Sequence, residues 1–154
     1  MPLCLNAMKV RSNIAAMPEL DPSQKRARAQ ESTYRRHILI VDDEDYILVL
    51  MEEVLRILGY QPLTAANAKQ ALQILAMQPV DLVITDMEMP GMSGIHLLQQ
   101  VKESHPSIPV VLITGYGLER AARVAEECGA DGFLGKPFHI EDLRFCISRL
   151  IEEL

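Results

Sequence analysis

The chain has few cysteines and no long apolar run. Its three cysteines are Cys4, Cys128 and Cys146. They are odd in number, far apart and without the spacing of metal ligands, which favours reduced thiols in a cytoplasmic protein. No apolar run approaches the roughly 18 residues that a membrane-spanning helix needs, so no membrane insertion is expected. Polar residues such as Asn6 and Lys9 interrupt the start of the chain, so no secretory signal peptide is expected there.

Positive charge is scarce in most of the chain. Residues 37–154 carry eight Lys and Arg against eighteen Asp and Glu, which gives a net charge of −10, whereas residues 1–36 have a net charge of +4. Because an acidic surface repels phosphates, we expect no direct nucleic acid binding by the folded part. Residues 1–34 lack a sustained helical or strand period and contain three prolines. This pattern predicts a flexible basic N-terminal arm ahead of one folded domain over residues 35–154.

Short apolar runs alternate with amphipathic segments from residue 35 onward. The strand-like runs cover residues 37–41, 60–65, 80–85, 109–114 and 131–135. The helical segments lie near residues 45–58, 67–77, 93–104, 117–128 and 139–153. This alternation predicts an α/β fold with a parallel sheet that is covered on both faces. Five such units fit a flavodoxin-like (βα)5 doubly wound sheet of order 2-1-3-4-5, whose ligands bind past the carboxyl ends of strands 1 and 3.

Four consecutive acids, from Asp42 to Asp45, follow the first strand-like run. Such a cluster repels itself and is costly to desolvate unless a cation balances it. A purely structural alternative is that Asp45 is the N-cap of the next helix and favours its dipole. Asn67 and Ser93 are likewise placed as N-caps, and Gly129 is placed where a helix ends.

Polar residues also follow the other strands of the predicted sheet. Strand 3 ends in Asp86, strand 4 ends in Thr114, and strand 5 runs into Lys136. Because strands 1 and 3 are neighbours, the carboxylates of Asp42, Asp43 and Asp86 should converge in one crevice. Three carboxylates require a cation, and Mg²⁺ suits such oxygen ligands. With the ammonium of Lys136 and the hydroxyl of Thr114, these groups make a site for a phosphoryl group.

The sequence around these residues resembles the receiver domain of two-component response regulators across about residues 37–154. The resemblance rests on VDDE at 41–44, VITDMEMPGMSG at 83–94, VLITGYG at 111–117 and FLGKPF at 133–138. It implies a phosphoprotein of phosphorelay signalling that receives its phosphoryl group from a histidine kinase or a phosphotransfer protein. It also implies that the chain is not a conventional enzyme and catalyses only its own phosphorylation and dephosphorylation.

The resemblance implies a role for each acidic residue of the site. Asp86 would be the phosphoacceptor. Asp43 and Asp86 would bind Mg²⁺ directly, together with the backbone carbonyl of Glu88. Asp42 would bind the metal largely through water.

The resemblance also assigns the remaining site residues. Lys136 would pair with the aspartate and then with the phosphoryl group, across a cis bond to Pro137. Thr114 would donate a hydrogen bond to a phosphoryl oxygen and act with Phe133 as a switch. The switch would alter the face formed by the helix near 117–128, the strand 131–135 and the last helix, where a downstream protein or a second copy would bind. We expect no effector domain after the last helix.

The alternative is an aspartate-nucleophile phosphatase of the haloacid-dehalogenase type, because Asp86-Met87-Glu88 imitates its D-x-D motif. In that class, however, the second acid should be Asp. The motif should also belong to the first strand, without an acid pair upstream. An assay for turnover of a phosphate ester distinguishes the two functions.

Overall fold

The structure is a computed structural model that describes residues 21–23, 35–115 and 117–152. The predicted arm over residues 1–34 lies outside the described residues, except for 21–23, and therefore stays a prediction. No helix within the described ranges is both long enough and apolar enough to span a membrane.

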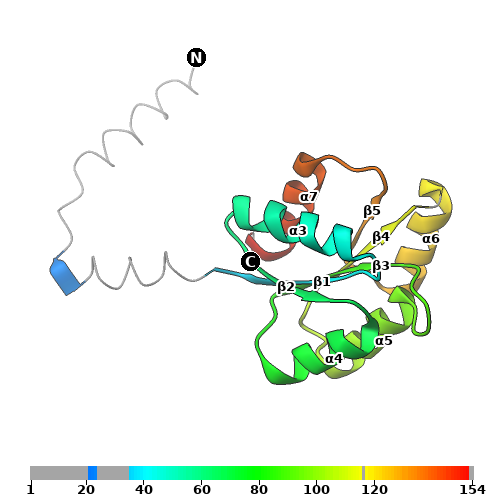
Figure 1. Cartoon of the computed structure of the whole chain (residues 1–154), viewed down its shortest axis with the longest axis horizontal. Coiled ribbons are helices and arrows are strands. Elements are labelled where there is room, and N and C mark those ends of the chain that lie inside the picture. The colour runs from blue at the N-terminus through cyan, green and yellow to red at the C-terminus, as the bar shows by residue number, and fades with distance from the viewer. Residues whose placement is uncertain (1–20, 24–34, 116, 153–154) are drawn as a thin grey trace, which may run out of the picture. The chain divides into compact units, whose positions relative to one another are not determined.

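Five parallel strands form one sheet in the order β2-β1-β3-β4-β5 (Figure 1). The strands are β1 (His37–Val41), β2 (Gln61–Ala65), β3 (Leu82–Asp86), β4 (Val110–Thr114) and β5 (Gly132–Gly135). The predicted fold class and strand order are confirmed. Successive strands are added on one side of β1 and then, from β3 onward, on its other side, and in such sheets ligands bind in the crevice at the carboxyl ends of β1 and β3.

Helices connect the strands and cover both faces of the sheet. They are α3 (Asp45–Ile57), α4 (Ala68–Met77), α5 (Gly94–Ser104), α6 (Leu118–Cys128) and α7 (Ile140–Ile147). A π-helical turn, η1 (Ser148–Glu152), follows α7 in place of the regular helix that we predicted to continue to residue 153. The turn still buries Ile151, so the apolar stripe of the last helix is preserved across the change in geometry.

Alternate strand residues pack into two separate cores. Leu39 and Val83 point to the face that packs against α4, α5 and α6. Ile40 and Ile84 point to the opposite face, which packs against α3 and α7. Successive side chains of a strand point to opposite faces, so a nearly continuous apolar strand supplies both cores. Each fully buried leucine or isoleucine contributes about 2 kcal/mol to this packing.

Capping side chains fix where two of the helices begin. The side chain of Asn67 accepts a hydrogen bond from the backbone N–H of Gln70 at 2.9 Å, and Ser93 accepts one from His96 at 3.3 Å. Both caps agree with the sequence pattern. Gly129 ends α6 with φ of 78°, a left-handed conformation that favours glycine. The caps at Asn67 and Ser93 fix where loops at the carboxyl edge of the sheet end, whereas Gly129 fixes the turn before β5 at the amino edge.

Candidate functional site

The register of the sheet brings Asp42 and Asp86 to the same level. Val41 of β1 is paired with Thr85 of β3, so the next residue of each strand is an aspartate at the carboxyl edge. Carboxylate oxygens of Asp42, Asp43 and Asp86 all lie within 4.8 Å of one another. Asp42 and Asp86 are buried, whereas Asp43 is exposed. The predicted convergence of three carboxylates is therefore present in the structure.

The four-acid cluster is not explained by helix capping. Asp45 is the first residue of α3, and the N-cap is Glu44, whose side chain makes no capping hydrogen bond. The interpretation of Asp45 as the N-cap is therefore wrong. Instead, the backbone N–H of Glu44 donates to Oδ1 of Asp42 at 2.9 Å, which holds that carboxylate at the start of the loop.

Lys136 is the cation that the structure places at this cluster. Its Nζ lies 3.4 Å from Oδ2 of Asp86 and 3.7 Å from Oδ2 of Asp42. Its backbone N–H donates to the carbonyl of Thr114 at 2.7 Å, and its bond to Pro137 is cis. These main-chain contacts direct the ammonium toward the carboxylates across the neighbouring strand.

Burial and charge shift the pKa values of the two groups that face each other here. Desolvation by burial is the main reason why the pKa of Asp42 is raised, and the neighbouring charge of Asp86 adds to it. Burial opposes the charge of Lys136, but the carboxylates of Asp86 and Asp42 outweigh it and raise the pKa of the ammonium. Lys136 is therefore charged at neutral pH, while the acids retain an excess of negative charge that one lysine does not balance.

The loop after β3 is packed tightly onto the backbone of Asp86. The backbone N–H of Glu88 donates to Oδ1 of Asp86 at 3.2 Å, and the N–H of Met87 donates to the carbonyl of Ile113 at 2.8 Å. A Cβ atom added to Gly94 would lie 2.0 Å from the carbonyl oxygen of Asp86. The first residue of α5 therefore packs directly against the backbone of Asp86, which ends β3, and only glycine fits at this contact.

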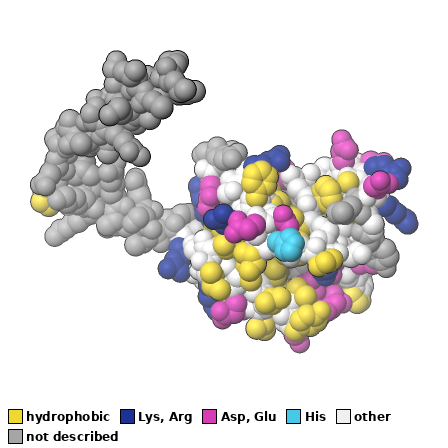
Figure 2. Space-filling view, turned by 90° about the horizontal axis from the view of Figure 1, so that it is seen from above, with side chains coloured by type: hydrophobic (Ala, Val, Ile, Leu, Met, Phe, Trp, Pro, Cys, Tyr) yellow, Lys and Arg dark blue, Asp and Glu magenta, His cyan; other side chains and the backbone are white. Residues whose placement is uncertain are grey.

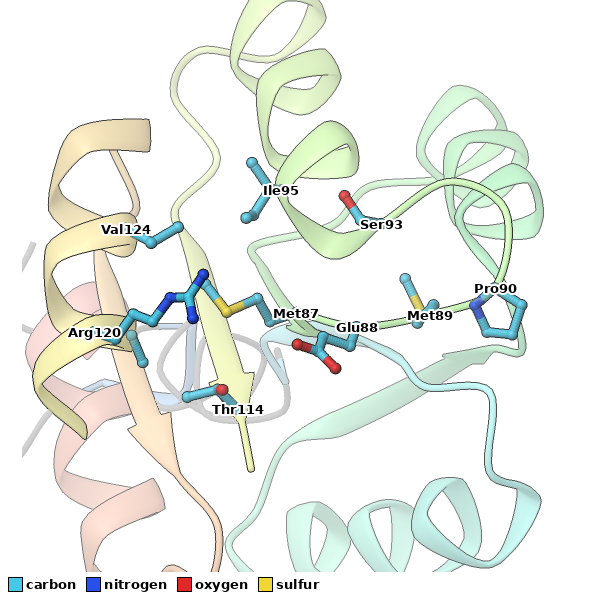
Figure 3. A pocket seen from close by; sticks show the side chains of 10 residues that line it. Met87, Glu88, Met89, Pro90, Ser93, Ile95, Thr114, Arg120 and Val124 are labelled. Carbon is cyan, nitrogen blue, oxygen red and sulfur yellow. The ribbon is translucent and has the colours of Figure 1, made fainter. Parts of the chain in front are cut away.

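Thr114 and Phe133 lie on neighbouring strands, with different exposure. Thr114 ends β4 and is buried, and it lines a cavity of about 640 Å³ together with Glu88 (Figure 3). Phe133 is paired in register with Leu112, two residues before Thr114 along β4. Its side chain is 36% exposed and lines a second cavity of about 750 Å³. Phe133 is therefore not an ordinary core residue in this structure, which leaves it room to change position.

Sequence reasoning did not single out two residues beside the site. Gly94 follows Ser93 in the quoted motif, but only the structure shows its contact with Asp86. Arg120 lines the same cavity as Glu88 and Thr114. A cation in the first turn of a helix is unfavourable to the helix dipole, and that signal could have drawn attention to Arg120.

The residues present fit a hard divalent cation. All three converging side chains are carboxylates, and no histidine or cysteine belongs to this group among the described residues. Oxygen ligands of this kind suit Mg²⁺, which keeps several waters, rather than zinc, which favours nitrogen and sulfur. The donor set, the charge excess and the nearby Lys136 thus agree with a site for a metal and a phosphoryl group.

Comparisons with known proteins give one consistent answer. The family model of the response regulator receiver domain matches residues 38–148. The chain is 40% identical over 114 residues to sporulation initiation phosphotransferase F of Bacillus subtilis, covering 74% of this chain and 92% of that protein. It is 42% identical over 114 residues to the response regulator protein PilR of Pseudomonas aeruginosa, again covering 74% of this chain but only 26% of that longer protein.

A solved structure agrees with the sequence matches. The crystal structure of the response regulator TrrA from Thermotoga maritima, in complex with Mg²⁺ and BeF, has a TM-score of 0.68 and is 33% identical. The match covers 75% of this chain and 98% of that one. These similarities give no support to the haloacid-dehalogenase alternative. The fold, the acidic crevice and the comparisons together show that this chain belongs to the family of response regulator receiver domains of two-component signalling.

Proposed function

We propose that Asp86 is the residue that accepts the phosphoryl group. The observation that carries this proposal is the position of Lys136 Nζ, 3.4 Å from Asp86 and 3.7 Å from Asp42, at the edge of a buried carboxylate cluster. Response regulators receive phosphate from histidine kinases, so the proposed donor is a phosphohistidine. A carboxylate oxygen of Asp86 forms the new O–P bond while the P–N bond breaks, and the imidazole leaves with the bonding pair.

The neighbouring side chains have separate tasks in this transfer. The Lys136 ammonium offsets negative charge on the transferred oxygens, and the Thr114 hydroxyl donates a hydrogen bond to one of them. Receiver domains generally bind Mg²⁺, and the metal would supply further charge neutralisation. Its proposed ligands are Asp43, Asp86 and the backbone carbonyl of Glu88, with Asp42 acting largely through water. The TrrA structure, which contains Mg²⁺ and BeF, supports the assignment by similarity.

A receiver domain is a signalling domain, and we infer that this one catalyses only its own phosphorylation and dephosphorylation. It contributes the nucleophile and the positioned charges, whereas the donor contributes the phosphoryl group. A cytoplasmic location and the N-terminal arm over residues 1–34 remain predictions of the sequence.

The α3 stripe, defined here as Tyr46, Val49, Leu50 and Ile57, is a candidate docking surface for the phosphoryl donor. These apolar side chains are 57–80% exposed. Figure 2 shows apolar side chains gathered among charged ones on one face of the folded part. Helix α3 begins three residues after Asp42, so a donor protein that covers the stripe would also reach the crevice.

The output face would consist of α6, β5 and α7. Phe133 on β5 and Phe145 on α7 are 36% and 66% exposed, and both line the cavity of about 750 Å³. We propose that phosphorylation moves Thr114 toward the phosphoryl oxygens and lets Phe133 turn inward. The rearranged face would then bind a downstream protein or a second copy of the chain.

The Asp86 assignment is tested by incubating the full chain with acetyl phosphate and Mg²⁺ and measuring the mass of the intact protein by mass spectrometry. We expect one added phosphoryl group in the wild type and none in Asp86→Asn. The control is Asp81→Asn, which changes an aspartate at the opposite end of the sheet and should still be labelled. Labelling of Asp86→Asn at another residue would show that the assignment is wrong.

A further inference from the structure

The cavity beside Asp86 has an acid and a guanidinium among its lining residues. Its volume is about 640 Å³, and it lies between the loop after β3 and the first half of α6. Within the described residues that line it, Glu88 is the one acid and Arg120 the one base. Figure 3 shows the Arg120 side chain extending from α6 toward Met87, with the Glu88 carboxylate on the loop beyond it. Apolar side chains such as Met89 and Val124 complete the lining.

Arg120 has no evident structural role in α6. It is the third residue of the helix, where the positive end of the helix dipole disfavours a cation. The same turn contains one acid, Glu119, which the dipole favours. No ion pair between described residues includes Arg120. The charge of Arg120 is therefore neither favoured by the helix dipole nor paired with an acid among the described residues.

Negative charge is in excess at this edge of the sheet. Five acids lie there, namely the three carboxylates of the crevice, Glu44 and Glu88, against the single ammonium of Lys136. A divalent cation and Lys136 together leave two net negative charges, which oppose an incoming anion. The guanidinium of Arg120 offsets part of that remaining charge from the other side of the cavity.

We propose that Arg120 is a specificity-determining residue, which offsets Glu88 and thereby favours phosphoryl donors of higher negative charge. The proposal rests on the assignment of Asp86 as phosphoacceptor. Arg120 forms no bond to the phosphorus in this account. It acts through its charge, by raising the local concentration of the donor and by lowering the energy of its approach to Asp86.

Two small donors of different charge test the proposal on the full chain. Acetyl phosphate carries two negative charges at neutral pH, and phosphoramidate carries one. With each donor, Asp86 gains an O–P bond, and acetate or ammonia leaves. Arg120→Ala should slow phosphorylation by acetyl phosphate about fivefold and by phosphoramidate about twofold, since the Coulomb energy scales with the charge of the donor. The rates are measured by separating phosphorylated from unphosphorylated protein over time.

Three controls separate charge from structure. Arg123→Ala removes an exposed arginine of the same helix that does not line the cavity, and its rates should equal those of the wild type. Glu88→Gln combined with Arg120→Ala should restore the acetyl phosphate rate to within about twofold of the wild type, because both charges are then absent. The difference between wild type and Arg120→Ala should shrink at high salt, which screens charges.

The outcomes separate this proposal from the Asp86 assignment. An equal loss with both donors, or a loss that salt and the Glu88→Gln change leave unaltered, would overturn the role of Arg120. So would a wild-type rate in Arg120→Ala. In each of these cases Asp86 would still carry the label. Labelling at a residue other than Asp86 would instead remove the assignment on which the proposal rests.

Discussion

At the amino end of the sheet Asp81 and Asp131 lie apart and each has its own donors, whereas at the carboxyl end three carboxylates lie together beside one ammonium. Before β3, Asp81 accepts a hydrogen bond from the backbone N–H of His37 at 2.7 Å. Before β5, Asp131 accepts one from the N–H of Val110 at 2.8 Å and one from Lys102 at 2.6 Å. These charges are satisfied within the chain, and they join neighbouring strands.

The carboxyl end has no such balance. Asp42, Asp43 and Asp86 face a single lysine, and burial raises the pKa of Asp42. Asp42 and Asp86 each accept a backbone hydrogen bond and lie near Lys136, but one ammonium does not balance three carboxylates. Buried charge in excess costs stability, so a chain selected for stability alone would not gather acids there. The comparison shows that the same residue type stabilises the fold where its charge is balanced and forms a candidate binding site where its charge is in excess.

Removing the acceptor Asp131 at the amino end of the sheet should have the largest effect on stability. Asp131→Ala leaves the N–H of Val110 and the ammonium of Lys102 without their shared acceptor, and we expect a loss of about 2–3 kcal/mol in the free energy of unfolding. Urea denaturation measures this loss. Glu103→Ala, which removes an exposed acid of α5, is the control and should change stability by less than about 0.5 kcal/mol. The rate of phosphorylation should be unchanged, and a slower rate would contradict the separation between the two ends.

Thr114→Ala should weaken the link between the site and the output face. The variant keeps Asp86 and Lys136, so it should accept phosphate. We expect the coupling between phosphorylation and binding of a partner or a second copy to fall by about 1–2 kcal/mol. Partner affinity, or the dimerisation constant, is measured with and without phosphorylation. A response equal to that of the wild type would show that the hydroxyl does not transmit the signal.

Removing one negative charge at the carboxyl end should have a smaller effect on stability, and this effect should be stabilising. Without Mg²⁺, Asp42→Asn should raise the free energy of unfolding by about 1 kcal/mol, because it removes a buried charge. The pKa of Asp42 is raised above its ordinary value of 3.8, so the carboxyl favours the folded state when protonated, and this contribution is lost as pH rises through the folded pKa.

The advantage of Asp42→Asn should therefore shrink as the pH is lowered toward 3.8, where the wild-type carboxyl is protonated as well. Thermal or urea unfolding across this pH range, with a chelator present, measures the difference. If the stability difference between Asp42→Asn and the wild type stays constant with pH, the charge of Asp42 is not its cause. Added Mg²⁺ should favour the wild type, because a metal that binds only the folded chain stabilises it.

Deleting residues 1–34 should have the smallest effect. Their lack of apolar periodicity predicts that the folded domain over residues 35–154 does not depend on them. We expect a change in the melting temperature of less than about 2 °C and an unchanged rate of phosphorylation. A large drop in melting temperature would show that the arm contributes to the packing of the domain.

Much of the fold was predictable because its signals are local. The apolar runs, the caps at Asn67 and Ser93, and the glycine at 129 mark the elements, and a parallel sheet leaves few possible orders for five βα units. The site residues followed from the same logic, since the carboxyl ends of neighbouring parallel strands meet at one edge. The acids of the crevice are therefore predictable from the ends of the apolar runs alone.

Other features were not predictable, because they depend on neighbours distant in sequence. Phe133 lies on the edge strand β5, where no further strand covers it, so its exposure cannot be read from the apolar run. The change from α7 to a π-helical turn leaves the spacing of buried residues such as Ile147 and Ile151 compatible with a regular helix. Arg120 becomes informative only when the structure shows that it lines the same cavity as Glu88.

The close approach of Gly94 to Asp86 has a consequence for natural and laboratory variation. Every amino acid other than glycine has a Cβ, so any missense change at this codon places an atom about 2.0 Å from the same carbonyl oxygen. In a saturation library selected for signalling, we expect nearly all functional variants to have glycine at position 94. Gly115, whose added Cβ would have no neighbour within 4 Å, should accept many replacements in the same library.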